Sequence, residues 1–115
     1  MRGDRERVLD MLDACRMLRT HLGGSREQLE SDPVAQAAAQ RWIEIIGEAA
    51  SRLSPSLREA HPQIPWNEII GMRHILAHGY FDIDVDVVWN VIARDAADLE
   101  VRLQSVLDAL PPSGA

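Results

Sequence analysis

The residues Ser31–Leu53, SDPVAQAAAQRWIEIIGEAASRL, decide the fold class of this chain. Asp32 is a residue type that caps the start of a helix, and Pro33 fits the first turn because the amide hydrogen that it lacks would have no partner there. Apolar residues then recur with the helical period along one face: Ala35, Ala38, Ala39, Trp42, Ile45, Ile46, Ala49 and Leu53. The stretch predicts a long amphipathic helix, and its alanines allow a second helix to pack close to it.

Three more amphipathic stretches accompany this helix, and the first and the last carry apolar residues at helical spacing: Val8, Met11, Leu12, Cys15, Leu18 and Leu22 in the first, and Val88, Ile92, Leu99, Leu103, Val106 and Leu110 in the last. One runs from about Arg5 to Leu22 and ends at two glycines, another runs from Pro65 to about His78, and the last runs from about Asp84 to Leu110, where two prolines end it. No stretch alternates with a period of two. The sequence therefore predicts an all-α fold, an antiparallel four-helix up-and-down bundle, in one domain of residues 1–115 with a frayed tail at 111–115.

Composition limits the environments and partners of the chain. No apolar run approaches the roughly 20 residues of a membrane-spanning helix, and the charged N-terminus does not resemble a secretory signal. We therefore expect a soluble, cytoplasmic protein. The formal charge of −6, with 12 basic residues that are all arginine against 18 acids, argues against indiscriminate binding of nucleic acid. Six arginines precede residue 27, so an RNA partner would have to meet a local basic surface.

The only cysteine, Cys15, cannot form an intramolecular disulfide. It falls on the apolar face of the first predicted helix, which favours a buried, inert thiol over a nucleophile.

Arg73 is the anomaly of the third predicted helix. At about 100° per residue it falls in the middle of the apolar face, which consists of Trp66, Ile69, Ile70, Leu76 and Ala77. An unpaired guanidinium there would be costly because burial removes its hydration. Two explanations remain open: a structural ion pair with an acid of the second helix, such as Glu44 or Glu48, or a site that binds an anion.

His74 and His78 are one helical turn apart on the shoulder of the same helix. Two such imidazoles can share a zinc ion, but no motif supplies a third ligand, since His21 and His61 lie in other segments. His78 directly precedes Gly79 at the expected end of the helix, where the helix dipole favours the charged imidazole. The sequence thus indicates a group that exchanges a proton near neutral pH.

Arg73 and His78 lie about 140° apart on an ideal helix, so they do not share one face. They can border one cleft if the helix loosens at Gly79 or if a second copy of the chain supplies one of them, and the second, simpler arrangement predicts a homodimer. In such a cleft an imidazole can take the proton of an RNA 2′-hydroxyl while a guanidinium stabilises the extra charge on phosphorus.

Two runs, RWIEIIGEAA at 41–50 and IPWNEIIGMRHILAHGYFDID at 64–84, resemble the HepT-like proteins of the HEPN superfamily. Arg73, His78 and Tyr80 fit the R-x4-H-x-Y signature of that family without a gap, and His74 occupies the position after the arginine where the superfamily carries a polar residue. The resemblance extends from about residue 5 to residue 110.

The resemblance implies a metal-independent endoribonuclease that needs no cofactor and acts as a homodimer, with Arg73 and His78 as catalytic residues and His74 in support. It also implies the toxin of a type VII-like toxin–antitoxin system, in which a minimal nucleotidyltransferase (MNT-like) antitoxin silences the toxin by transferring AMP to Tyr80. Two alternatives remain: a HEPN module that dimerises or binds a partner without catalysis, and a Tyr80 that is only a core or interface aromatic.

Overall fold

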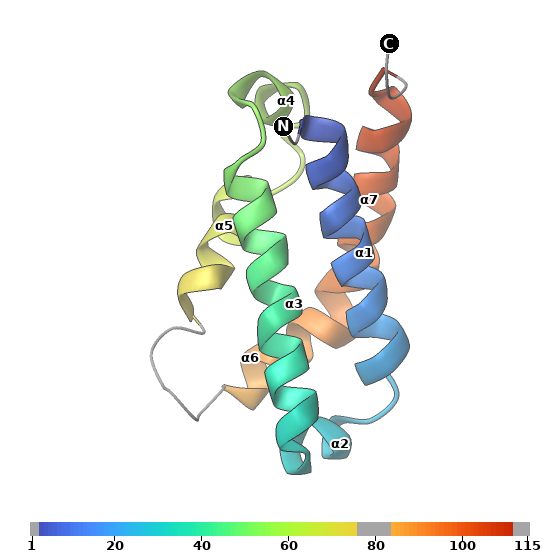
Figure 1. The fold of residues 1–115 in the computed structure, drawn as a ribbon, viewed down its shortest axis with the longest axis vertical. Coiled ribbons are helices and arrows are strands. Elements are labelled where there is room, and N and C mark those ends of the chain that lie inside the picture. The colour runs from blue at the N-terminus through green and yellow to red at the C-terminus, as the bar shows by residue number, and fades with distance from the viewer. Residues whose placement is uncertain (1–2, 76–83, 112–115) are drawn as a thin grey trace.

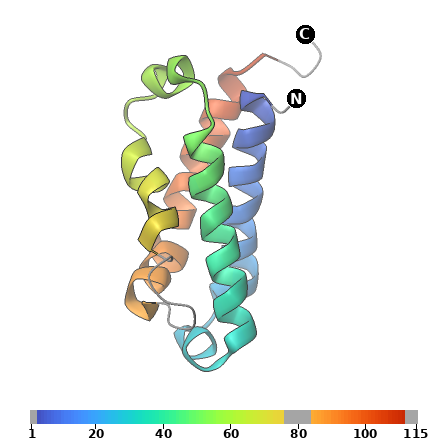
Figure 2. The same cartoon turned by 60° about the vertical axis from the view of Figure 1, so that its left-hand side comes forward.

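A computed structural model of the chain describes residues 3–75 and 84–111, and these residues form helices and no strand (Figure 1). The long helical stretches are α1 (Asp4–Leu22), α3 (Pro33–Ser51), α5 (Trp66–Ile75) and a composite of α6 (Val85–Asn90), η2 (Val91–Asp95) and α7 (Ala96–Ala109). Successive stretches run in opposite directions in Figures 1 and 2. The predicted all-α fold and the up-and-down order of its long stretches are confirmed.

Two short helices add to the predicted four. α2 (Arg26–Ser31) and α4 (Pro55–Ala60) lie in the connections on either side of α3. Ser25 caps α2 by accepting a hydrogen bond from the Gln28 amide, and Leu29 of α2 is fully buried. A helix of six residues shows too little of the 3.6-residue period to be recognised in a sequence, which is why the pattern did not predict α2.

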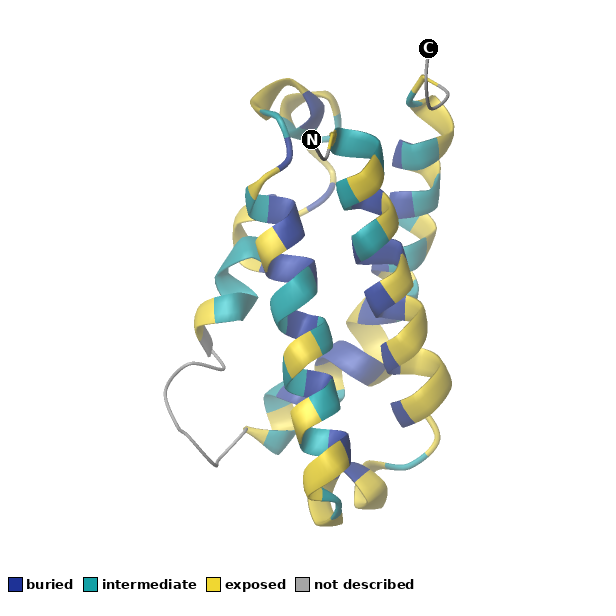
Figure 3. Ribbon diagram, in the orientation of Figure 1, coloured by how far each residue is buried: buried dark blue, intermediate teal, exposed yellow. Residues whose placement is uncertain are grey.

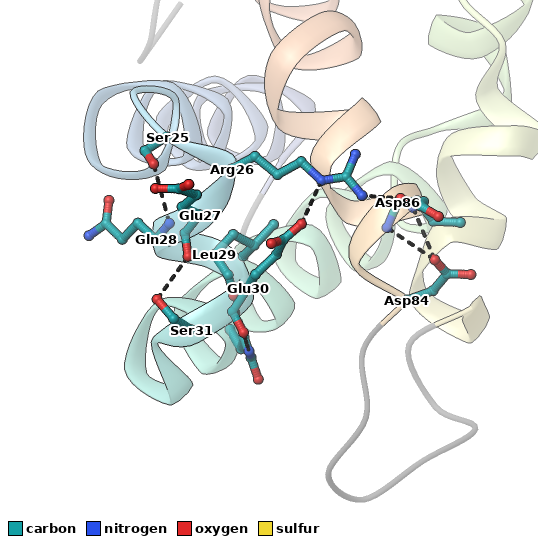
Figure 4. A network of polar contacts seen from close by, with 11 residues as sticks. Ser25, Arg26, Glu27, Gln28, Leu29, Glu30, Ser31, Asp84 and Asp86 are labelled. Atoms are coloured by element: carbon teal, nitrogen blue, oxygen red, sulfur yellow. Dashed lines mark hydrogen bonds and ion pairs between the residues drawn. The ribbon is translucent and has the colours of Figure 1, made fainter.

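α2 is tied to the start of α6 by a polar network (Figure 4). The Arg26 guanidinium forms ion pairs with Glu30 of its own helix, at 2.8 Å, and with Asp86 of α6. Asp84 caps α6, because its Oδ1 accepts hydrogen bonds from the amides of Asp86 and Val87. One arginine thus lies between two carboxylates at this end of the bundle.

α3 is the central helix, because α1 packs on one of its sides and α5 on another. Its buried arc is therefore wider than the predicted face, and it includes Ile43, Gly47 and Ala50 in addition to predicted members such as Ala35 and Ile46. Trp42, Ile45 and Ala38, which the pattern placed on the same face, are only half-buried. Figure 3 shows the buried residues concentrated where the helices face one another.

α1 buries all the apolar residues predicted for it, Val8, Met11, Leu12, Cys15, Leu18 and Leu22. The prediction of a buried thiol is confirmed, since Cys15 has no exposed surface. Burial in apolar surroundings, together with the charge of Glu100, raises the pKa of the Cys15 thiol to about 12. The thiol therefore stays protonated near neutral pH, and a protonated thiol is a poor nucleophile.

The last predicted helix is continuous but irregular. It begins after Asp84, passes through a π-helical turn at Val91–Asp95 and continues to Ala109. Of the apolar residues in phase along it, Val88, Ile92, Leu99, Leu103 and Val106 are in the core, whereas Leu110 is only half-buried. Within the described part of the chain, no helix is both long enough and apolar enough to cross a membrane.

Candidate functional site

Arg73 is held against α3 by a close approach of two helices at Gly47. A Cβ atom at position 47 would lie 3.1 Å from the Arg73 Cβ and 3.1 Å from the Ile69 carbonyl oxygen. The glycine lets α5 pack this closely, since a side chain at position 47 would make its neighbours on α5 give way by a few tenths of an ångström. The sequence carried a signal for this contact, a glycine in the interior of a long helix, but the helical period alone did not assign it a role.

The guanidinium of Arg73 binds the last turn of α3. Its Nη1 donates hydrogen bonds to Glu48 Oε2 at 2.9 Å and to Ser51 Oγ at 3.1 Å. Of the two predicted acids, Glu48 is thus the partner, while Glu44 contacts Arg41 at 3.8 Å. The prediction of an ion pair with an acid of the second long helix is confirmed for Glu48.

Arg73 nevertheless keeps access to solvent, since 31% of its side chain is exposed. Its Nη2 makes no hydrogen bond to the residues that the structure describes. Each guanidinium has five N–H donors in a planar fork, which suits the oxygens of a phosphate group. The ion pair with Glu48 therefore fixes the Nη1 edge of the fork.

Glu48 is shared between two arginines. Its Oε1 accepts a hydrogen bond of 2.8 Å from Arg52 Nε, and its Oε2 binds Arg73. The hydrogen bonds from Arg52 and then Arg73 hold the pKa of the Glu48 carboxyl below its ordinary value. Two guanidinium groups on one carboxylate leave a net positive charge at this point of the surface. Sequence reasoning did not single out Ser51 or Arg52, although both follow Glu48 within one turn.

His74 is exposed beside Arg73. Its Nε2 accepts a long hydrogen bond of 3.4 Å from Arg73 Nε, which requires that this nitrogen carry no proton. This contact places the His74 ring directly against the Arg73 guanidinium.

His78 and Tyr80, the other two predicted site residues, lie outside the described residues, as does Gly79. The structure thus brings Arg73 together with Glu48, Ser51 and His74, and it does not test the positions of His78 and Tyr80. The metal hypothesis depends on His78 as well. Among the described residues, no group of three or more His, Cys, Asp or Glu side chains could hold a metal ion.

Comparison with known proteins shows the family. The family described as "Ribonuclease HepT-like" matches residues 11–106. The chain belongs to the HepT-like ribonuclease family. This match runs from α1 to α7 and contains Arg73, His74, His78 and Tyr80, so it confirms the resemblance to the HEPN superfamily that the signature indicated. No solved structure matches the HepT-like chain.

Several relatives are similar over most of their length. A protein named "Putative RNase" of Caldanaerobacter subterraneus subsp. tengcongensis is 36% identical over 108 residues, which are 93% of this chain and 96% of that protein. A "Probable ribonuclease HepT" of Thermococcus cleftensis is 36% identical over 80 residues, 70% of this chain and 73% of the relative. A third relative, from Methanocaldococcus jannaschii, also carries the name "Putative RNase". It is 30% identical over 84 residues, which are 73% of this chain and 72% of the relative.

Proposed function

We propose that this HepT-like chain is a metal-independent endoribonuclease in which Arg73 binds the scissile phosphate and His78 transfers protons. The observation that carries the proposal is the state of Arg73: a half-buried guanidinium, fixed on one edge by Glu48 and Ser51, with Nη2 unbound among the described residues. Membership in a family of ribonucleases supports the same role for it.

The proposed reaction is an internal transfer on phosphorus. His78 removes the proton of the RNA 2′-hydroxyl, the 2′-oxygen bonds to phosphorus, and the bond from phosphorus to the 5′-oxygen breaks. Arg73 stabilises the extra negative charge while phosphorus has five oxygens around it. The leaving 5′-oxygen receives a proton from a second His78, supplied by the other copy in a homodimer. The products are a 2′,3′-cyclic phosphate and a 5′-hydroxyl.

The proposal extends to regulation in the cytoplasm. The chain acts as the toxin of a type VII-like pair, and its antitoxin is an MNT-like nucleotidyltransferase. The Tyr80 hydroxyl attacks the α-phosphorus of ATP in the antitoxin, a phosphodiester to AMP forms, and pyrophosphate leaves. The added phosphate brings negative charge beside Arg73 and His78, where it repels an incoming RNA backbone.

Cleavage of RNA in excess EDTA tests the enzymatic proposal. We expect the wild-type chain to cut and to leave 2′,3′-cyclic phosphate ends. Arg73→Ala and His78→Ala should lose cleavage while they keep their helical content and their size in solution. Arg41→Ala is the matched control, since this arginine is 71% exposed and its ion pair with Glu44 is a long one of 3.8 Å. Wild-type rates in both site variants would remove these residues from the mechanism.

A second candidate function follows from the acidic partner of Arg73. A HEPN module that dimerises or binds a partner without catalysis would need Arg73 only for the Glu48 ion pair. The overall charge of −6 favours this alternative over a free RNA-binding enzyme. Tight binding of the nucleotidyltransferase by a chain that cuts no RNA would establish it.

A further inference from the structure

A second basic surface lies between α1 and α7, away from Arg73. α1 packs directly on α7, and the two helices border a groove of about 480 Å³. The polar residues of the groove are Arg16 and Arg19 from α1, and Glu100, Gln104 and Ser105 from α7. Both arginine side chains are about half exposed, 52% and 45%, whereas Glu100 is 20% exposed. The positive groups therefore lie nearer to solvent than the acid that pairs with them.

The two arginines have more donors than the groove has acceptors. Arg16 uses Nε for Glu100 at 3.3 Å and Nη2 for Gln104 at 3.4 Å, and Arg19 uses Nη1 for Glu100. Each guanidinium has five N–H donors, so most of them have no acceptor among the described residues. Two positive charges on one carboxylate also leave a surplus of one positive charge in the groove.

Charge is segregated across α1. Asp10 and Asp13 of the same helix line a different groove, which α1 borders together with α3. The edge of α1 that faces α7 therefore presents arginines, and the edge that faces α3 presents acids. In a chain with a formal charge of −6, this separation creates the kind of local basic surface that RNA requires.

We propose that the α1–α7 groove binds backbone phosphates of single-stranded RNA as a second contact, separate from the cleavage site. The inference rests on the proposed ribonuclease function, and it adds the part of the substrate that the groove would hold. Arg16 and Arg19 supply the charged donors to phosphate oxygens, since Gln104 Nε2 already donates to Asp108 Oδ1 at 3.0 Å and Ser105 Oγ donates to the Val101 carbonyl oxygen at 3.4 Å. The contact follows the backbone and is independent of base sequence.

The separation between Arg73 and the α1–α7 groove determines how long an RNA must be to contact both. α5 carries Arg73 and packs on α3, and α3 packs in turn on α1 (Figure 1), whereas the groove is lined by residues of α1 and α7. Two steps between packed helices, of about 8–10 Å each, separate α5 from α1. A trinucleotide is too short to follow the surface over that path, whereas a 30-nucleotide RNA is long enough. The groove should therefore affect only long substrates.

The test compares two double variants that each change the formal charge from −6 to −8. Arg16→Gln/Arg19→Gln removes the groove cations and keeps side chains of similar length. Arg26→Gln/Arg41→Gln is the matched control, because Arg26 lies between Glu30 and Asp86, and Arg41 lines the groove that contains Asp10 and Asp13. RNA binding is measured with both double variants in a chain that also carries His78→Ala, so that the RNA is not cut. RNA cleavage is measured with both double variants in a chain that keeps His78.

The readout is the salt dependence of binding to a labelled 30-nucleotide RNA of mixed sequence. Loss of two phosphate contacts should reduce the slope of log affinity against log salt by about 1.4, since each contact contributes about 0.7 for a single strand. The Arg26→Gln/Arg41→Gln control should change this slope little. In cleavage, the groove variant should raise KM for the 30-nucleotide RNA, leave kcat unchanged, and leave a trinucleotide substrate unaffected.

Equal slopes for the groove variant and the parent overturn the inference, and so does an equal loss in the control variant. Absence of RNA binding at every salt concentration also overturns it. The proposed function is judged separately, by whether the wild-type chain cuts RNA. If the groove variant keeps its RNA slope but loses binding of a polyglutamate peptide, the surface recognises acidic protein, and the inference is wrong.

Discussion

Arg73 and Glu48 lie 25 positions apart in the sequence and form an ion pair of 2.9 Å between Nη1 and Oε2. Glu48 binds Arg52 with its other oxygen, so three charges of alternating sign connect α5 to the end of α3. An RNA phosphate that binds Arg73 has to compete with this carboxylate. The ion pair therefore positions Arg73 and at the same time lowers its affinity for a second anion.

Replacement of Glu48 by glutamine should strengthen RNA binding. The amide oxygen of glutamine can still accept the hydrogen bond of Arg73, but the competing negative charge is lost. We expect a lower dissociation constant and a steeper salt dependence for Glu48→Gln, measured by fluorescence anisotropy with a labelled RNA in a His78→Ala chain. Glu44→Gln, one turn earlier and next to Arg41, is the control. Weaker binding by Glu48→Gln would mean that the charge matters more for orienting Arg73 than for competing with RNA.

The same pair predicts a pH dependence of stability. Arg52 and Arg73 lower the pKa of the folded Glu48 carboxyl from its ordinary value of 4.5. The stabilisation that this shift provides is present above pH 4.5, and it disappears as the pH falls through the folded pKa. The melting temperatures of the wild-type chain and Glu48→Gln should therefore differ at neutral pH and converge in acid. A constant difference down to the lowest pH would show that the charge of Glu48 does not contribute.

Gly47→Ala should separate α5 from α3. The new Cβ would lie 3.1 Å from both the Arg73 Cβ and the Ile69 carbonyl oxygen, so the helices have to move apart. Overpacking of this kind costs about 1–3 kcal/mol, which urea unfolding can measure, and RNA cleavage should fall because Arg73 loses its support. At Gly71 an added Cβ meets nothing within 4 Å. Gly71→Ala should therefore stabilise the helix by about 0.5–1 kcal/mol, and equal effects at both positions would contradict the prediction.

Local patterns were sufficient to predict much of the fold. The apolar period of α1 identified its core residues, and Asp32 with Pro33 identified the start of α3, where the Asp32 side chain accepts a hydrogen bond from the Val34 amide. The burial of Ile43 and Gly47 could not be predicted in this way. It depends on α3 having neighbours on two sides, and that arrangement is a property of the assembled bundle.

The partner of Arg73 illustrates a similar limit. The helical pattern placed a charge on an apolar face and named Glu44 and Glu48 as possible partners, but these acids are one turn apart and nearly equivalent on an isolated helix. The choice depends on how far α5 is shifted along α3, which the close contact at Gly47 determines. The sequence showed an excess of arginines before residue 27, but it could not place Arg16 and Arg19 around Glu100, because that arrangement arises only when α1 packs on α7.

Cys15 should resist alkylation in the folded chain. Its thiol has no exposed surface, and burial raises its pKa to about 12. Iodoacetamide at pH 8 should leave the native mass unchanged and add one group in urea. Between the ordinary thiol pKa of 9.0 and about 12, the unfolded chain loses this proton and the folded chain keeps it, so stability should decline over that range. Rapid labelling of the native chain would show that α1 opens locally.

Tyr80 is the only tyrosine of the chain, which makes the proposed modification easy to assign. If the nucleotidyltransferase silences the toxin at this residue, wild-type protein incubated with the antitoxin and ATP should gain one or more AMP masses and lose RNA cleavage. The phosphate of AMP competes with RNA for the Arg73 guanidinium. Tyr80→Phe should keep its helical content and its nuclease activity, since its hydroxyl has no role in the proposed proton transfers, but it should gain no AMP and stay active. AMP on Tyr80→Phe would place the modification on a serine or threonine, and an unmodified wild-type chain that is nevertheless inhibited would mean that the antitoxin acts by binding alone.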